Sequence, residues 1–157
     1  MDVFKLTTYS EDDTMEIAKQ LASLLDRGDV LTLEGDLGAG KTTFTKGLAK
    51  GLNIEENVSS PTFTIIKEYT DGKLPLYHMD VYRLEGSDED IGFEEYFYGN
   101  GISIVEWAQF IEDYLPNEVL SITIHYGEEG SRIIEFAPYG PYYHSIVESL
   151  FINVKGL

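Results

Sequence analysis

The order of apolar and polar residues along the chain predicts helices and strands that alternate. Residues 15–25 place apolar side chains three and four positions apart, which indicates a helix with one buried face, and Ser10 upstream is a candidate helix cap. Residues 30–34 predict a short strand. A glycine-rich loop follows this strand and leads into a second helix that we expect to end at Gly51.

The rest of the chain predicts two hairpins and four further elements. Residues 62–69 and 74–82 form one hairpin around an Asp-Gly turn, and residues 119–126 and 131–136 form the other across residues 127–130. The remaining elements are an acidic helix at 87–97 capped by Ser87, a buried strand at 101–107, a short helix at 108–114 and a final helix at 141–152 that begins at Pro141. Repeats and long linkers are missing from the sequence, so we expect a single domain over residues 1–157. Its fold class is α/β, with three layers around a central mixed, partly antiparallel sheet.

Composition narrows the classes of function. The formal net charge is −17, and residues 84–157 hold 14 of the 28 acidic side chains but only two of the 11 basic ones, Arg132 and Lys155. A surface of this kind repels nucleic acid and favours a basic partner or plain solvent. The sequence has no cysteine, which excludes thiolate metal sites and thiol nucleophiles. It also lacks a long apolar span or a signal pattern, so we expect a cytoplasmic protein that makes no membrane contact.

The strongest chemical signal is a phosphate-binding loop at residues 35–42, GDLGAGKT, which fits the pattern G-x-x-x-x-G-K-[ST] of P-loop NTPases. It lies between a predicted strand and a predicted helix, where backbone N–H groups and the helix N-terminus can surround phosphates. Lys41 can reach the β- and γ-phosphates, Thr42 can bind Mg²⁺, and Thr43 can lie near the α-phosphate. The loop residues expected to contact nucleotide are Asp36, Leu37, Gly38, Ala39, Gly40, Lys41, Thr42 and Thr43.

A nucleotide site of this type also needs a carboxylate at the end of a neighbouring strand. Asp80 and Glu106 each follow an apolar run, and both are candidates for the metal or its waters. A hydroxyl-rich segment after the second helix is a candidate mobile loop that senses the γ-phosphate; an ordinary proline turn is the alternative. Its residues of interest are Ser60, Pro61, Thr62 and Thr64.

Motifs that are missing from the sequence argue against other classes of nucleotide-binding protein and against a histidine metal site. The sequence has no Asn/Thr-Lys-x-Asp motif, so a GTPase lacks support, and it is too short and too poor in arginine for the lid of a small-molecule kinase. The three histidines are far apart and favour structural positions over a metal cluster. Trp107 is expected in the core or in a pocket wall.

Four segments in this order, GDLGAGKTTF, VSSPTFTIIKEY, YHMDVYRL and ISIVEW, make the chain similar to the TsaE family from about residue 10 to residue 136. The resemblance implies a weak ATPase that uses ATP and Mg²⁺ and acts with a TsaD-like catalytic protein and its TsaB-like paralogue. These partners form N6-threonylcarbamoyladenosine (t6A) at position 37 of ANN-decoding tRNAs, so the chain would meet tRNA indirectly, through the complex.

The resemblance also implies roles for individual residues. Lys41 would bind phosphate, Thr42 and Glu106 would hold Mg²⁺, and Asp80 would lie on the γ-phosphate side, on the metal shell or orienting water. Ser60, Pro61 and Thr62 look like the switch loop of the family, and the nucleotide would also lie near Ser10, Glu11 and Arg132. A nucleotide-dependent binding module whose hydrolysis is incidental is the alternative function.

Overall fold

The computed structural model describes residues 2–36, 38–61, 64–87 and 90–154. Seven strands form one mixed sheet in the order β1-β7-β6-β2-β5-β4-β3. Their bounds are β1 Phe4–Thr8, β2 Val30–Gly35, β3 Ile66–Tyr69, β4 Leu76–Asp80, β5 Ile102–Glu106, β6 Val119–Tyr126 and β7 Arg132–Tyr139. The predicted α/β fold with a central mixed sheet is confirmed, as are the hairpins β3–β4 and β6–β7.

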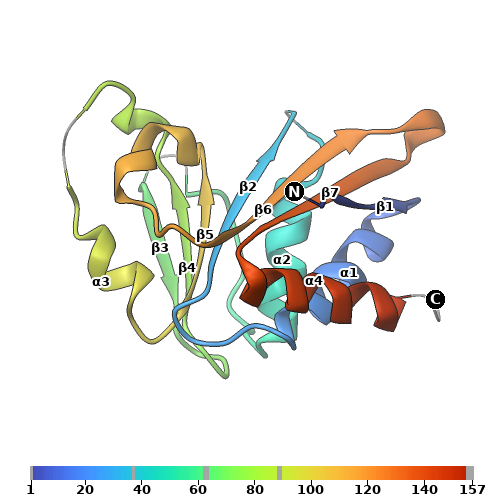
Figure 1. Cartoon of the computed structure of the whole chain (residues 1–157), viewed down its shortest axis with the longest axis horizontal. Helices are drawn as coiled ribbons and strands as arrows, with labels where there is room; N and C mark the ends of the chain where they lie inside the picture. Colours follow the sequence, from blue (N-terminus) through green and yellow to red (C-terminus); the bar gives the residue numbers. More distant parts are fainter. Residues whose placement is uncertain (1, 37, 62–63, 88–89, 155–157) are drawn as a thin grey trace.

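Helices cover both faces of the sheet (Figure 1). Helices α1, α2 and α4 pack on one face, and α3 and η2 pack on the opposite face of the β2, β5 and β4 half. Their bounds, with the short 3-10 helices η1 and η3, are α1 Glu11–Ala22, α2 Lys41–Gly51, η1 Tyr82–Leu84, α3 Phe93–Phe97, η2 Ala108–Tyr114, η3 Glu128–Gly130 and α4 Pro141–Val154. In the described part of the chain, no helix has the length and apolar character needed to cross a membrane.

The alternation of side chains along the strands decides which face each residue serves. On the buried central strand β5, Ile102 and Ile104 join the core under α1, α2 and α4, whereas Val105 joins the smaller core under α3. Helix α2 lies close against α1 because Gly47 has no side chain: a Cβ there would lie 2.5 Å from the carbonyl oxygen of Met15. This close contact fixes the start of α1 beside the start of α2.

Among the strands of the described residues, β1 is the one that sequence analysis does not predict. Its segment is short, and only the alternation of Phe4, Leu6 and Thr8 toward the interior marks it as a strand. Its partner β7 lies at the other end of the chain, so no local pattern indicates the pairing. Directly after it, Ser10 caps α1 by accepting a hydrogen bond of 3.1 Å from the N–H of Asp13. Because of this cap, α1 starts at Glu11, four residues before the start predicted at residue 15.

Helix α3 is shorter than the predicted helix at 87–97. Gly92 has a φ of 93°, a left-handed conformation that interrupts a helix. The N-cap residue is Gly92 rather than Ser87, and the Asp90 carboxylate just before it accepts from the N–H groups of Gly92 and Phe93. Strand β3 is shorter than the predicted strand at 62–69 and begins at Ile66, because Ile65 has a φ of 67° and breaks the extended backbone.

Candidate functional site

Five strand ends meet at one edge of the sheet. Strands β2, β4, β5 and β6 are parallel, and β1 runs the same way because both β1 and β6 are antiparallel to β7. Their carboxyl ends therefore lie side by side, which is where open α/β sheets bind ligands. Thr8, Gly35, Asp80, Glu106 and Tyr126 are the last residues of these five strands.

The phosphate-binding loop leaves this edge between β2 and α2. Gly38 and Gly40 have φ values of 78° and 115°, which residues with side chains rarely adopt. The N–H of Ala39 donates to the carbonyl of Asp36 at 2.9 Å. Helix α2 starts at Lys41 with no side-chain cap, so the N–H groups of its first turn remain available for an anion.

A cavity of about 900 Å³ opens above the loop. Most of the predicted site residues line it, namely Ser10, Glu11, Asp36, Gly38, Ala39, Gly40, Lys41, Thr42, Thr43, Ser60, Asp80, Glu106 and Arg132. Of the other predicted positions, Pro61 and Thr64 do not line the cavity, and Leu37 and Thr62 lie outside the described residues. The structure adds wall residues that sequence analysis did not select, namely Thr14, Tyr82 and Gly130, and it places Gly35 of the loop and Trp107 in the wall as expected.

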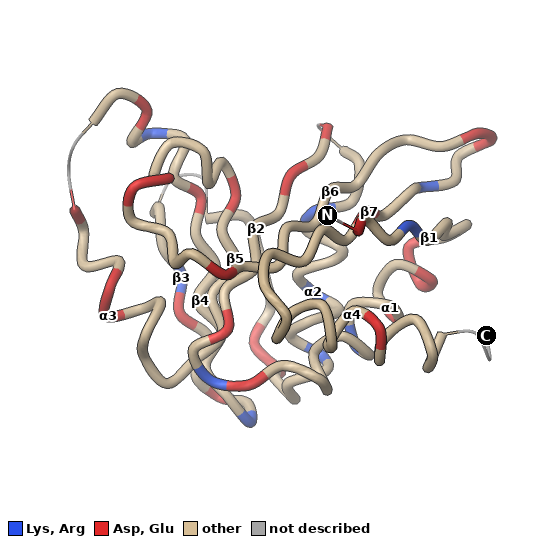
Figure 2. Tube along the Cα trace, in the orientation of Figure 1, with Lys and Arg blue, Asp and Glu red and all other residues tan. Residues whose placement is uncertain are grey.

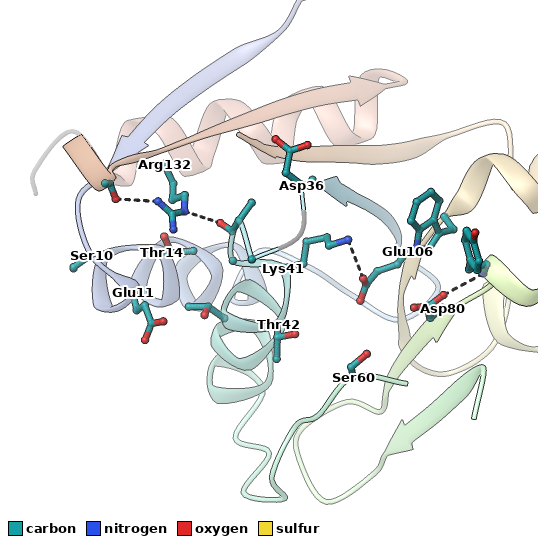
Figure 3. A pocket seen from close by; sticks show the side chains of 18 residues that line it. Ser10, Glu11, Thr14, Asp36, Lys41, Thr42, Ser60, Asp80, Glu106 and Arg132 are labelled. Carbon is teal, nitrogen blue, oxygen red and sulfur yellow. Dashed lines mark hydrogen bonds and ion pairs between the residues drawn. The ribbon is translucent and has the colours of Figure 1, made fainter. Parts of the chain in front are cut away.

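The cavity has two chemically different ends (Figure 3). Ser10 and Arg132 lie at one end, and Ser60 and Asp80 lie at the other. Lys41 lies between them and points toward the strand ends. A ligand with a phosphate chain over the loop would therefore have its terminal phosphate beside carboxylates and the rest of the molecule beside α1 and β7.

Asp80 and Glu106 are paired directly across the parallel strands β4 and β5. Both residues are only 6% exposed, so the two carboxylates lie side by side on the wall of the cavity with little of their surface open to solvent. The ammonium of Lys41 lies 3.6 Å from Oε1 of Glu106, and the N–H of Tyr82 donates to Oδ1 of Asp80 at 3.1 Å. Like charges at directly opposed strand positions repel each other, and a cation between the two carboxylates would relieve the repulsion.

These residues fit a magnesium ion held together with a phosphate chain. The described residues contain no group of three or more histidine, aspartate or glutamate side chains that could hold a metal ion by themselves. Mg²⁺ is commonly bound through one or two carboxylates, with waters and substrate phosphates as the other ligands. Asp80, Glu106 and the Thr42 hydroxyl line the same cavity and supply the oxygen atoms for such a site.

His78 is the residue of this site that sequence analysis placed in a structural role. It precedes Asp80 by two positions on β4, so both side chains project from the same face of the strand. Its side chain is fully buried, and Nε2 lies 2.7 Å from Oε2 of Glu106. The two-residue spacing from Asp80 is the signal that could have indicated it.

Arg132 joins the β6–β7 hairpin to the phosphate-binding loop. Its Nε donates to the carbonyl of Ala39 at 3.0 Å, and its Nη1 donates to the carbonyls of Gly130 and Ser131 at the same distance. The guanidinium carbon lies 4.7 Å from the ring centroid of Tyr126. Arg132 therefore supports the loop and the hairpin end, at the opposite end of the cavity from Asp80 (Figure 3).

The segment before β3 is connected to Asp80 through the backbone. The carbonyl of Pro61 accepts from the N–H groups of Thr64 and Ile65. The carbonyl of Ile65 accepts from the N–H of Asp80 at 2.8 Å. Ser60, next to Pro61, lines the cavity. Backbone hydrogen bonds therefore connect the residues that flank this segment to the strand that carries Asp80.

Comparisons with known proteins identify the family of this chain. The family model described as "Threonylcarbamoyl adenosine biosynthesis protein TsaE" matches residues 8–134. The chain is 55% identical over 150 residues to the tRNA threonylcarbamoyladenosine biosynthesis protein TsaE of Bacillus subtilis, covering 96% of this chain and 95% of that protein. The protein of the same name from Nostoc is 43% identical over 140 residues, covering 86% of each chain.

A solved structure shows the same fold. The crystal structure of YdiB from Bacillus subtilis superimposes with a TM-score of 0.86 and 49% sequence identity, covering 97% of this chain and 96% of that one. The sequence match extends over most of the chain and includes every segment that lines the cavity. This chain belongs to the TsaE family.

Proposed function

We propose that this protein binds ATP with Mg²⁺ and hydrolyses it slowly to ADP and phosphate, in support of t6A formation on tRNA. The observation that carries the proposal is the meeting of Lys41 and Glu106, 3.6 Å apart, in a cavity that begins at a phosphate-binding loop. A lysine from the loop and a carboxylate from a neighbouring strand are the parts that a P-loop nucleotide site requires. The names of the relatives supply the pathway.

Each group has a role in this proposal. The N–H groups of the loop and of the first turn of α2 bind the phosphates, and Lys41 moves from Glu106 toward the β- and γ-phosphates. Thr42 and Glu106 hold Mg²⁺, which neutralises charge on the phosphate oxygens. Asp80 completes the metal shell or orients the attacking water. Ser10, Glu11 and Arg132 surround the nucleoside end.

Slow hydrolysis follows from the position of the arginines. In fast P-loop enzymes an arginine supports the charge that develops on the transferred phosphoryl group. Among the described residues, Arg132 is the arginine that lines the cavity, and its hydrogen bonds hold it at the far end from Asp80. This arrangement also favours the second candidate function, a module that docks onto its partners in the ATP-bound form and whose hydrolysis is incidental.

The partners in this proposal are a TsaD-like catalytic protein and its TsaB-like paralogue, which hold the tRNA. Acidic residues are spread over the whole trace of the chain, with few basic residues between them (Figure 2). Such a surface does not suit direct contact with tRNA phosphates. The cytoplasm, where tRNA is modified, is the proposed location.

The test is an ATPase assay with and without the purified partners and tRNA. Stimulation of phosphate release by the complete mixture supports the proposal, and an unchanged rate contradicts it. Replacing ATP with a non-hydrolysable analogue separates the two candidates. Sustained rounds of modification with the analogue favour the docking module, whereas arrest after one round favours a hydrolytic role.

A further inference from the structure

His78 is a buried polar residue that the proposed site does not yet explain. Its side chain is fully buried beneath the carboxylate end of the cavity. Among the described residues, its Nδ1 has no hydrogen-bond partner, while Nε2 lies 2.7 Å from Oε2 of Glu106. A buried imidazole of this kind destabilises the fold relative to an apolar side chain of similar size. Stability of the fold therefore does not explain why a histidine contacts Glu106 at this position.

The hydrogen bonds indicate which tautomer is present. A neutral imidazole has one N–H donor and one bare nitrogen that accepts. Because a carboxylate only accepts hydrogen bonds, the proton must lie on Nε2, where it is donated to Glu106. Nδ1 is then the bare nitrogen, and the buried group left without a partner is an acceptor, which protein interiors tolerate better than an unpaired N–H.

Glu106 is consequently held by both of its oxygen atoms. Oε2 accepts from His78 on the neighbouring strand. Oε1 lies 3.6 Å from the ammonium of Lys41, a contact drawn in Figure 3. The first contact is buried in the sheet layer, and the second belongs to the loop that binds phosphate. When Lys41 turns to a phosphate chain, the contact with His78 remains.

We propose that His78 is a positioning residue, which fixes the Glu106 carboxylate so that Oε1 faces the cavity and takes part in Mg²⁺ binding. This inference rests on the proposed function of the cavity as a site for ATP and Mg²⁺. Asp80 lies directly opposite Glu106, and the repulsion between these carboxylates would turn an unheld Glu106 away. Loss of such a supporting hydrogen bond at metal sites lowers metal affinity or activity by about 10- to 100-fold.

A matched pair of variants tests the proposal. His78→Gln places an amide N–H near the position of Nε2, whereas His78→Asn places it near the position of Nδ1, out of reach of Glu106. Both remain polar and uncharged. Ser103→Ala is the control, since Ser103 is also fully buried, lies on β5 and has a hydroxyl without a hydrogen-bond partner among the described residues.

The first measurement is the affinity for ATP by titration calorimetry, with Mg²⁺ at graded concentrations and with EDTA. We expect His78→Asn to need about 10- to 100-fold more Mg²⁺ for the same gain in affinity, with unchanged affinity in EDTA. His78→Gln and Ser103→Ala should follow the wild type. The second measurement is phosphate release, in which kcat should fall for His78→Asn and recover for His78→Gln.

The outcomes separate this inference from the proposed function. A wild type that binds no ATP in either buffer contradicts the proposed function. A wild type that responds to Mg²⁺, with a His78→Asn variant that responds equally, overturns the role of His78 alone. Equal losses in His78→Asn, His78→Gln and Ser103→Ala also overturn it, because they indicate a general effect on folding.

Discussion

Asp80 and Glu106 lie opposite each other on the parallel strands β4 and β5, and both carboxylates are almost completely buried. In the free protein, the ammonium of Lys41 and the Nε2–H of His78 compensate Glu106. Stability alone does not favour two buried acids in this position. The arrangement fits a binding site in which a cation that arrives with the ligand balances the remaining negative charge of the two carboxylates.

Relief of this repulsion should be measurable without any ligand. We expect Asp80→Asn to raise the melting temperature of the free protein, because removing one of two opposed charges contributes about 0.2–1 kcal/mol. For a chain of this size the increase in Tm is up to about 4 °C. Differential scanning calorimetry in EDTA is the measurement. Glu56→Gln, an exposed position with the same change of charge, is the control, and a lower Tm for Asp80→Asn contradicts this interpretation.

Lys41 should control nucleotide affinity. We expect Lys41→Ala to weaken ATP binding by about 10- to 100-fold, since a hydrogen bond to a charged group contributes about 1.5–3 kcal/mol. Isothermal titration calorimetry measures the change. Lys50→Ala at the other end of α2 removes the same charge outside the cavity and should bind as the wild type does. Equal affinities of the two variants for ATP would contradict the placement of the phosphates beside Lys41.

The contact between His144 and Asp2, just before β1, should stabilise the folded protein more at low pH than at high pH. His144 on α4 contacts Asp2 at 3.0 Å and Glu148 at 2.9 Å, and the hydrogen bond to Asp2 is the main cause that raises the pKa of His144 above its usual 6.5. A raised pKa stabilises the folded state below pH 6.5, and this stabilisation is lost as the pH rises through the raised value.

The measurement for His144 is the Tm of the free protein at pH 6 and at pH 8. The wild type should lose more stability between these values than His144→Gln, which keeps a hydrogen-bonding side chain without the charge. The same pH dependence in both proteins would show that the contact with Asp2 contributes nothing measurable. The protection factors of the β1 amides against hydrogen exchange should fall from pH 6 to pH 8 in the wild type only, because β1 begins two residues after Asp2.

Direct binding of tRNA should be weak. With a net charge of −17, the chain has no basic excess to displace counterions from the tRNA backbone. We expect no saturable binding of labelled tRNA to the isolated protein at about 0.15 M salt, measured by fluorescence anisotropy. Binding should require the partner proteins. A tight complex with the isolated chain would contradict the view that the partners hold the tRNA.

Sequence patterns predicted the parts of this site that are encoded locally. The phosphate-binding loop has a fixed spacing, and Asp80 and Glu106 each end an apolar run, so their positions at strand ends followed from the pattern. The register that places the two acids opposite each other did not follow. Register depends on the pairing of strands 26 residues apart and is visible only in the fold.

Other parts depend on contacts between distant segments. The pairing of β1 with β7 brings Ser10 to the edge where the loop begins, and no local pattern predicts it. Likewise, His78 resembles an ordinary strand residue until its neighbour Glu106 is known. Helix α3 differs from its prediction because Gly92 outweighs the helical character of the acidic residues before it.

The most direct test of the account is phosphate release by an Asp80→Asn, Glu106→Gln double variant compared with the wild type under saturating ATP and Mg²⁺. Removing both carboxylates should reduce turnover by at least about 100-fold, because the site would lose its metal-binding oxygens. ATP binding in EDTA should persist in the variant, since the loop and Lys41 remain. Turnover at the wild-type rate would contradict the assignment of Asp80 and Glu106 to the catalytic end of the cavity.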